Sequence, residues 1–247
     1  MPRDDERSTL FRRARVAVLL SILVVVIAYA VTDVRSRRAR TEWRRTLEVA
    51  IVVVRAAPID EGAVPALVER AVALDAALDA EMRRYRQGGP APFHFTVLGP
   101  IDGAPPPRAD ADGLWAAITH SLALTMWTRD VDARASVNRR AFDARIYVSA
   151  RPRASRTRVS VEGDSEPGGR VGTVSVDLDA TSADYALAVV AHEALHTLGA
   201  TDKYGSDGRV VEPGGLAEPD AVPRYPQAKY EVMTRGRLVA PGVERAP

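Results

Sequence analysis

The chain has 247 residues, of which 46% are hydrophobic and 27% are charged, as is typical of a folded globular protein rather than a disordered one. The formal net charge of +2 comes from nearly balanced basic and acidic totals, so the composition predicts no nucleic-acid partner. The chain has no cysteine, which excludes disulfides, cysteine nucleophiles and thiolate metal sites.

The first predicted element is an uncharged apolar run, 16–31. Arginines flank it: Arg12, Arg13 and Arg15 before it, and Arg35, Arg37, Arg38 and Arg40 after it. The run is shorter than the ~20 residues of a comfortable membrane span but longer than most signal-peptide cores. We predict a single-pass anchor that leaves the rest of the chain after the anchor outside the cytoplasm. The alternative is a secreted chain, because Ala28-Tyr29-Ala30 has the form of a cleavage site and would allow cleavage near Ala30.

After Thr46 the sequence alternates between strand-like and helix-like patterns. In chain order we predict a strand at 47–55, a helix at 64–86, a strand at 93–98, a helix at 114–129, a strand at 144–150, and a hairpin of 159–162 with 171–178. In the second helix, Trp115, Leu122 and Met126 share one face. This order predicts an α+β or α/β domain whose single mixed, twisted sheet is flanked by helices.

The last predicted helix starts at about Ser182 and is apolar on nearly every side, which predicts a buried central position. Thr181 and Asp184 are predicted to form a capping box at its start. Gly199 is predicted to end it in a left-handed conformation. The helix and the residues after it contain HEALHTLGATDKY, 192–204.

His192 and His196 lie one turn apart, so both rings can reach one zinc ion at ~2.0–2.1 Å. A zinc ion would satisfy a buried imidazole pair that otherwise needs ordinary hydrogen bonds, and Glu193 could then activate a zinc-bound water. A catalytic zinc usually has three protein ligands, and Asp202 is the first suitable side chain beyond the turn at Gly199. The rival acids for the third position are Asp207, Glu212, Glu218 and Asp220.

HEALHTLGATDKY resembles the HExxHxxGxxH/D signature of the metzincin zinc proteases. The aspartate variant is similar to the snapalysin and immune-inhibitor-A-like bacterial groups, which also have a tyrosine two residues after that aspartate, as Tyr204 is here. The resemblance implies that His192, His196 and Asp202 are metal ligands and that Glu193 is the general base.

The resemblance also implies a methionine in a tight turn beneath the zinc, and Met233 is the only methionine after the motif. Several metzincins have a tyrosine two residues after that methionine, where this chain has Arg235. Tyr204, Tyr225 and Tyr230 are therefore the candidates for a tyrosine acting in the transition state. Metzincins bind extended substrate along an edge strand, for which the candidate is 171–178.

We therefore predict a zinc-dependent metalloendopeptidase that cleaves protein or peptide substrates, with one catalytic Zn²⁺ and a membrane association through the N-terminal segment. The alternatives are a membrane-tethered, zinc-stabilised binding module without catalysis, and a zinc hydrolase acting on a non-peptide amide. Structural Ca²⁺ at 110–113 or 163–166 is a weaker idea, because neither segment has EF-hand spacing. The predicted organisation is a basic tail at 1–15, an anchor or signal segment at 16–34, a basic linker at 35–45, a metzincin-like domain at 46–240 and a tail at 241–247.

Overall fold

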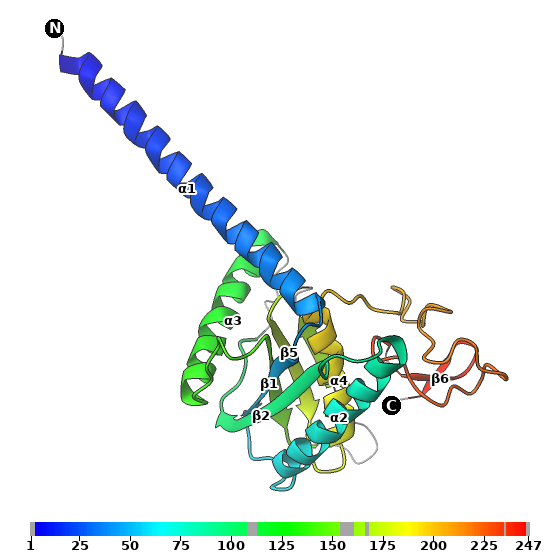
Figure 1. The fold of residues 1–247 in the computed structure, drawn as a ribbon. Helices are drawn as coiled ribbons and strands as arrows, with labels where there is room; N and C mark the ends of the chain where they lie inside the picture. The colour runs from blue at the N-terminus through cyan, green and yellow to red at the C-terminus, as the bar shows by residue number, and fades with distance from the viewer. Residues whose placement is uncertain (1–2, 108–112, 154–160, 166–167, 235, 246–247) are drawn as a thin grey trace. The chain divides into compact units, whose positions relative to one another are not determined.

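The computed structural model describes residues 3–107, 113–153, 161–165, 168–234 and 236–245, with side chains from residue 11 onward. The chain divides into two compact units, 1–42 and 43–247. The first unit is one helix, α1 (Arg3–Thr41), and its part Phe11–Thr41 is long and apolar enough to cross a membrane (Figure 1). The same test is passed by signal sequences, so the helix is a candidate for either role.

The second unit is built on a five-stranded sheet with the strand order β2-β1-β3-β5-β4 (Figure 1). Its strands are β1 (Leu47–Arg55), β2 (Phe93–Asp102), β3 (Ala144–Arg151), β4 (Val161–Ser165) and β5 (Val171–Asp177). The first three strands and β5 are parallel, and β4 runs antiparallel to β5. The predicted mixed sheet and its hairpin are therefore confirmed, and residues 159 and 160 of the hairpin lie outside the described residues.

The edge strand is β4, so the prediction that 171–178 forms the edge was wrong. Gly163, Asp164 and Ser165 were expected in a loop because of their residue types, but they continue β4 and pair along β5. This places β5 between two neighbours, where Val174 and Val176 are fully buried. The mixed sheet thus ends in a short, polar strand whose outer side pairs with no other described strand.

Helices cover both faces of the sheet (Figure 1). One face packs against α2 (Ala63–Tyr85) and α4 (Ala183–Thr197), and the other against α3 (Leu114–Arg134). Successive residues of a strand point to opposite faces. In β1, Val49 and Ile51 accordingly join the core under α2 and α4, whereas Val52 joins the core that includes Val131 of α3. Burial on both faces explains why this strand is apolar without alternation.

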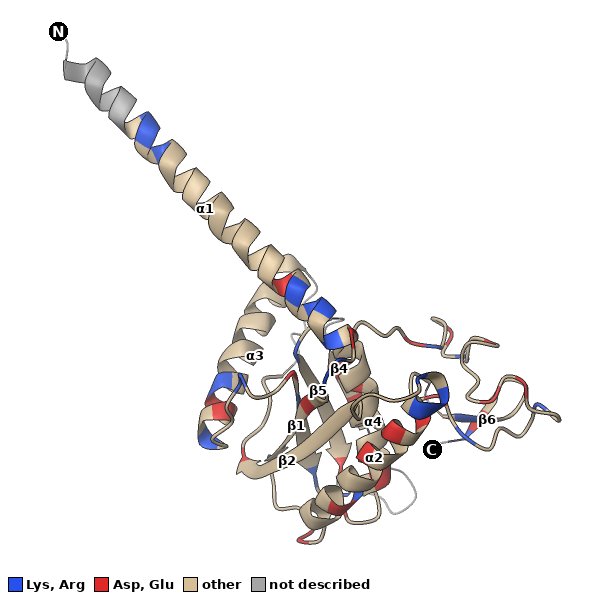
Figure 2. Ribbon diagram, viewed as in Figure 1, with Lys and Arg blue, Asp and Glu red and all other residues tan. Residues whose placement is uncertain are grey.

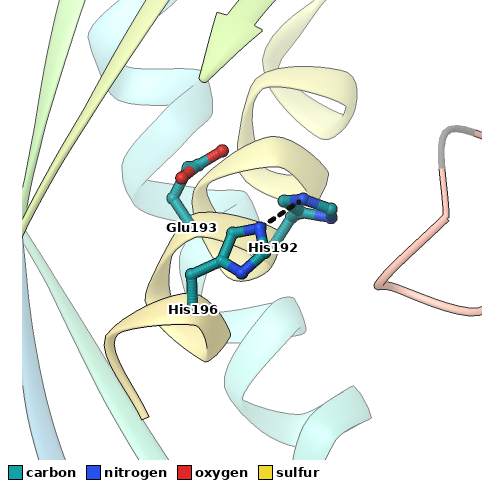
Figure 3. A group of neighbouring side chains, drawn as sticks. All are labelled: His192, Glu193 and His196. Atoms are coloured by element: carbon teal, nitrogen blue, oxygen red, sulfur yellow. Dashed lines mark hydrogen bonds between the residues drawn. The ribbon is translucent and has the colours of Figure 1, made fainter. Parts of the chain in front are cut away.

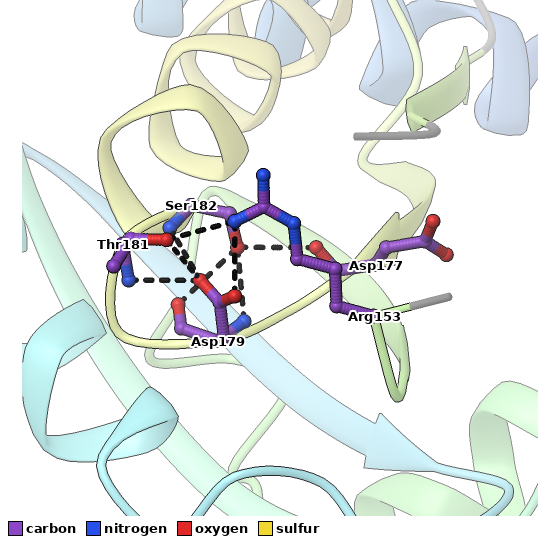
Figure 4. Close-up of polar contacts among 5 residues, drawn as sticks. All are labelled: Arg153, Asp177, Asp179, Thr181 and Ser182. Atoms are coloured by element: carbon purple, nitrogen blue, oxygen red, sulfur yellow. Dashed lines mark hydrogen bonds and ion pairs between the residues drawn. The ribbon is translucent and has the colours of Figure 1, made fainter. Parts of the chain in front are cut away.

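Reciprocal hydrogen bonds between Asp179 and Ser182 close the turn that leads into α4, in place of the predicted capping box (Figure 4). The Asp179 carboxylate accepts the backbone N–H groups of Thr181 and Ser182 at 2.8 and 2.9 Å, and the Ser182 hydroxyl accepts the Asp179 N–H at 2.9 Å. Burial acts to raise the pKa of Asp179, but hydrogen bonds from Thr181 and Arg153 outweigh it and hold the pKa at about 2. The predicted partner Asp184 instead pairs with Arg70 of α2, so the prediction of a Thr181–Asp184 box was wrong.

After α4 the chain forms a long connection without helix up to a short hairpin, β6 (Arg237–Ala240) and β7 (Val243–Arg245). The side chain of the buried Gln227 holds the connection together. Its amide oxygen accepts the N–H of Glu218, and its amide nitrogen donates to the carbonyls of Glu218 and Arg224. Its own N–H donates to Leu238 in β6 at 2.9 Å. The hairpin, which includes residues assigned from sequence to a tail, is therefore part of the folded unit.

Candidate metal centre

The central helix α4 presents one side to the core and another to a cleft. Ala186, Leu187, Val190 and Ala194 are buried in the core, as the helical spacing predicts. His192 and His196 lie on the other side and are only partly covered. The helix ends where expected, because Gly199 adopts φ +92° and its N–H bonds the His196 carbonyl at 2.8 Å.

Backbone carbonyl groups orient both imidazole rings. Nδ1 of His192 lies 2.8 Å from the carbonyl oxygen of Val232, and Nδ1 of His196 lies 2.8 Å from that of Ala200. A carbonyl only accepts, so each Nδ1 donates a hydrogen to its carbonyl, and in the corresponding neutral tautomer Nε2 is the atom free to bind a metal ion. The two Nε2 atoms face one another at 3.0 Å (Figure 3).

Asp202 brings a third donor atom to the same point. Its Oδ1 lies 3.2 Å from Nε2 of His192 and 3.3 Å from Nε2 of His196. The neighbouring Lys203 fixes this stretch, since its N–H donates to the carbonyl of Met233 at 2.9 Å. The structure thus places all three predicted ligands together, and their role as ligands stays a prediction.

Three of the rival acids have other partners. Asp207 accepts the N–H of Arg209 at 3.0 Å, Glu212 accepts the hydroxyl of Tyr225, and Glu218 accepts the N–H of Ala228 at 2.8 Å. Asp220 is exposed. Asp202 is therefore the acid whose position fits the two histidines.

The three donor atoms fit a small divalent cation. The two Nε2 atoms and Oδ1 of Asp202 lie within 3.3 Å of one another, and a bound cation would interact favourably with all three when both rings are in the neutral tautomer. Ligands ~2.1 Å from a tetrahedral ion stand about 3.4 Å apart, close to the three observed separations. Two imidazoles with one carboxylate suit zinc and other first-row transition ions better than Ca²⁺ or Mg²⁺, which prefer oxygen.

Met233 lies in a tight turn beside this cluster. The turn is closed by the N–H of Thr234, which donates to the carbonyl of Glu231 at 2.9 Å. Met233 is buried, and Val232 in the same turn supplies the carbonyl that orients His192. The turn therefore packs against α4 through His192, and the role of Met233 beneath a metal ion stays a prediction.

The Glu193 carboxylate lies against β4, next to the two histidines on the same helix (Figure 3). It is only 4% exposed, and its carboxylate accepts a hydrogen bond of 2.5 Å from the hydroxyl of Ser165. Carboxylate and imidazole donor atoms lie within 4.8 Å of one another. Burial raises the pKa of Glu193, and the hydrogen bond from Ser165 and the two histidines oppose this rise.

Glycine is required beside this carboxylate. A Cβ atom at Gly163 would lie 2.0 Å from Oε1 of Glu193, and one at Gly172 would lie 3.4 Å from its Cβ. Both glycines belong to the β4–β5 hairpin, which therefore approaches α4 closely at this point. Ser165 and Gly163 could not be identified from the sequence, since nothing in their spacing connects them with a helix that begins about twenty residues later.

A cavity of about 410 Å³ opens next to the histidines. It lies between α4, β4 and the turn at Val232, and its lining includes Tyr185, Tyr204 and Tyr230. The ring of Tyr204 stacks on that of His192 at 6.5 Å between centroids, and burial raises the pKa of Tyr230 to about 12. Of the three tyrosine candidates, Tyr204 and Tyr230 therefore lie at the cavity, whereas Tyr225 binds Glu212 in the outer loop.

The described residues give no support to the calcium sites considered at 110–113 and 163–166. In the calcium candidates, positions 110–112 and 166 lie outside the described residues, and Gly163 to Ser165 form a strand rather than a loop. Arg235, two positions after Met233, also lies outside the described residues.

The chain was compared with known protein families, with curated proteins and with solved structures, and none of them matches it.

Proposed function

We propose that this chain is a zinc-dependent metalloendopeptidase. The observation that carries the proposal is the convergence of Nε2 of His192, Nε2 of His196 and Oδ1 of Asp202 within 3.3 Å of one another. The Glu193 carboxylate lies beside this cluster, and Glu193 lines the adjacent cavity. Three ligands and an adjacent carboxylate are the parts of a hydrolytic zinc site, whereas a structural zinc would have four protein ligands.

His192, His196 and Asp202 would hold the zinc ion, which would supply Lewis-acid chemistry: polarisation of the scissile carbonyl and a water that is acidic near neutral pH. In the proposed reaction, Glu193 takes the proton of the attacking water and delivers it to the leaving amine. Ser165 keeps the carboxylate aimed by donating to one of its oxygens, which leaves the other oxygen for the proton transfer. Tyr204 and Tyr230 line the cavity as hydroxyl donors for the substrate or the transition state.

The shape of the site favours a peptide over another amide. Val161, Glu162 and Gly163 of β4 line the cavity, and β4 is the edge strand of the sheet. An extended peptide can add to such an edge through backbone hydrogen bonds while its side chains enter adjoining pockets. This feature has no evident use in a hydrolase for small amides.

We further propose that the domain is metzincin-like. Three features support this proposal. The sheet is parallel with one antiparallel edge strand, Gly199 ends α4 after His196, and Met233 is buried in the turn whose backbone bonds His192.

We also infer that α1 is a single-pass anchor with the domain outside the cytoplasm. Signal cleavage near Ala30 is the alternative, and the mass of the chain recovered from membranes distinguishes the two.

The experiment that tests the proposal is metal removal and return. We expect the purified chain to contain about one zinc per molecule by elemental analysis and to cleave an unstructured protein such as casein. Dialysis against a chelator should abolish cleavage, and stoichiometric zinc should restore it, whereas Ca²⁺ should not. A chain without zinc, or one whose cleavage survives the chelator, would refute the proposed function.

Ser165 offers a test of how the base is held. We expect Ser165→Ala to lower kcat about 10-fold to 100-fold with little change in KM, because a hydrogen bond to a charged group is worth about 1.5–3 kcal/mol. Zinc content should not change. Ser165→Thr keeps the hydroxyl and should recover most of the rate. An equal loss in both variants would indicate that the strand, not the hydrogen bond, is what matters.

A further inference from the structure

Two of the three proposed metal ligands are held by consecutive carbonyl groups of one turn. The carbonyl of Val232 accepts the Nδ1 hydrogen of His192 at 2.8 Å, and the carbonyl of Met233 accepts the N–H of Lys203 at 2.9 Å. Lys203 directly follows Asp202, so the second bond fixes the backbone that carries this ligand. The two ligands come from different parts of the chain, and the turn is what they share.

The shape of this turn, which we call the supporting turn (231–234), therefore bears on the separation of His192 and Asp202. Nε2 of His192 and Oδ1 of Asp202 lie 3.2 Å apart. The remaining ligand, His196, is held by the carbonyl of Ala200 near the end of α4, independently of the turn. A change in the supporting turn would thus move two ligands relative to each other and to the third.

Thr234 holds the supporting turn closed. Its N–H donates to the carbonyl of Glu231 at 2.9 Å, and its hydroxyl lies 2.6 Å from the same carbonyl oxygen and 2.9 Å from that of Gly236. A hydroxyl has one hydrogen, so the two carbonyls share it. Thr234 is 5% exposed, and water therefore has little access to replace these bonds. Because Gly236 directly precedes β6, the hydroxyl also ties the turn to the β6–β7 hairpin.

Charged side chains contribute less to the shape of this turn. Acidic and basic residues are distributed along the connection after α4 and on the β6–β7 hairpin (Figure 2). Within the supporting turn the charged residue is Glu231, whose Oε1 lies 3.4 Å from the backbone nitrogen of Met233, beyond the usual range for a hydrogen bond. The Thr234 hydroxyl is therefore the side-chain group that bonds most closely inside the turn.

We propose that Thr234 is a positioning residue of the metal centre. Its hydroxyl holds the supporting turn, and the turn keeps His192 and Asp202 at the separation that one ion requires. The proposal rests on the proposed function, because it needs a zinc ion at these ligands. Groups that orient metal ligands typically change metal affinity about 10-fold to 100-fold when they are removed, and we expect a loss of this size without the hydroxyl.

Three threonine variants of the full chain, purified in detergent, test the proposal. Thr234→Val keeps the branched shape but removes the hydroxyl, whereas Thr234→Ser keeps the hydroxyl. The matched control is Thr128→Val. Thr128 is 6% exposed, its hydroxyl donates to the carbonyl of Thr125 at 3.0 Å, and it belongs to α3 on the other face of the sheet.

The measured quantity is zinc affinity, obtained by competition with a chromophoric chelator. We expect Thr234→Val to bind zinc about 10-fold to 100-fold more weakly than the wild-type chain, and Thr234→Ser and Thr128→Val to bind it nearly as tightly. The visible spectrum of the Co²⁺-loaded chains is a second readout, since it depends on ligand geometry, and it should change in Thr234→Val alone. Hydrolysis is not used, because Thr234 also lines the cavity.

Each other result would overturn the proposal in a recognisable way. Unchanged zinc affinity in Thr234→Val would show that the hydroxyl does not position the ligands, and the proposed function would stand. Equal weakening in Thr234→Ser would assign the effect to the packing of the methyl group. Equal weakening in Thr128→Val would assign it to a general loss of stability. A wild-type chain that binds no zinc would instead refute the proposed function, and this proposal with it.

Discussion

Replacing Glu193 with glutamine is expected to lower the rate of peptide hydrolysis by about 10²–10⁴-fold while zinc stays bound. The amide has nearly the shape of the carboxylate and can still accept the hydrogen bond from Ser165, so the buried surroundings should be preserved. It cannot, however, take a proton from the attacking water. The loss should therefore appear in kcat, with KM close to that of the wild-type chain.

The matched control is Glu162→Gln, which makes the same change in the same cleft. Glu162 lines the cavity from the edge strand, but it is exposed and is not part of the histidine cluster. We expect this variant to keep most of the activity. Measurements of zinc content and of kcat on both variants decide the matter. Full activity in Glu193→Gln would show that another group acts as the base.

The second large effect concerns the metal ligands. We expect His196→Ala and Asp202→Ala each to reduce bound zinc from about one per chain toward zero after dialysis, because each removes one of three protein ligands. Hydrolysis should disappear with the metal. The fold should survive, since both residues lie outside the two buried clusters that form the core. Circular dichroism of the variants checks this separately from metal content.

Asp207→Ala is the control for the third ligand. Asp207 is a rival acid five positions later, and it bonds Arg209 rather than the histidines. This variant should keep its zinc. The opposite pattern, in which Asp202→Ala retains zinc and Asp207→Ala loses it, would mean that the loop rearranges around the ion. The assignment of Asp202 would then have to be abandoned.

The sequence predicted well what depends on short spacing. A run of β-branched residues sufficed for β1, and the separation of His192 and His196 predicted neighbouring rings on α4. Gly199 ended that helix as expected, because the left-handed conformation is a local property of glycine. Such features are fixed by a few consecutive residues, so one sequence contains enough information for them.

Other features depended on partners far away in the chain. The predicted capping box of Thr181 with Asp184 does not form. Asp179 instead pairs with Ser182 in the turn before α4, where Arg153 binds Asp179 and Arg70 draws Asp184 away. Neither arginine could be assigned to its partner from the sequence.

The edge strand was missed for a similar reason. Glycine, aspartate and serine at 163–165 are typical of a turn, and only the pairing with β5 makes them a strand. With that strand misassigned, its contact with Glu193 could not be foreseen. The helical spacing of α3 likewise grouped Trp115, Leu122 and Met126 on one face, but it could not tell that this face would be the exposed one.

The carbonyl groups that hold the two histidines bear on whether the chain would fold before or after it binds a metal ion. The carbonyl groups of Val232 and Ala200 belong to the backbone, and the buried core lies elsewhere. If the proposed zinc site exists, the rings are thus held by bonds that do not depend on the ion, and we expect the chain to fold without zinc, in contrast to small zinc domains that are unfolded without it. The ion would then bind to a folded chain. The supply of metals in the compartment where the domain resides would decide which transition metal it takes, since preference by ligand type alone separates neighbouring metals poorly.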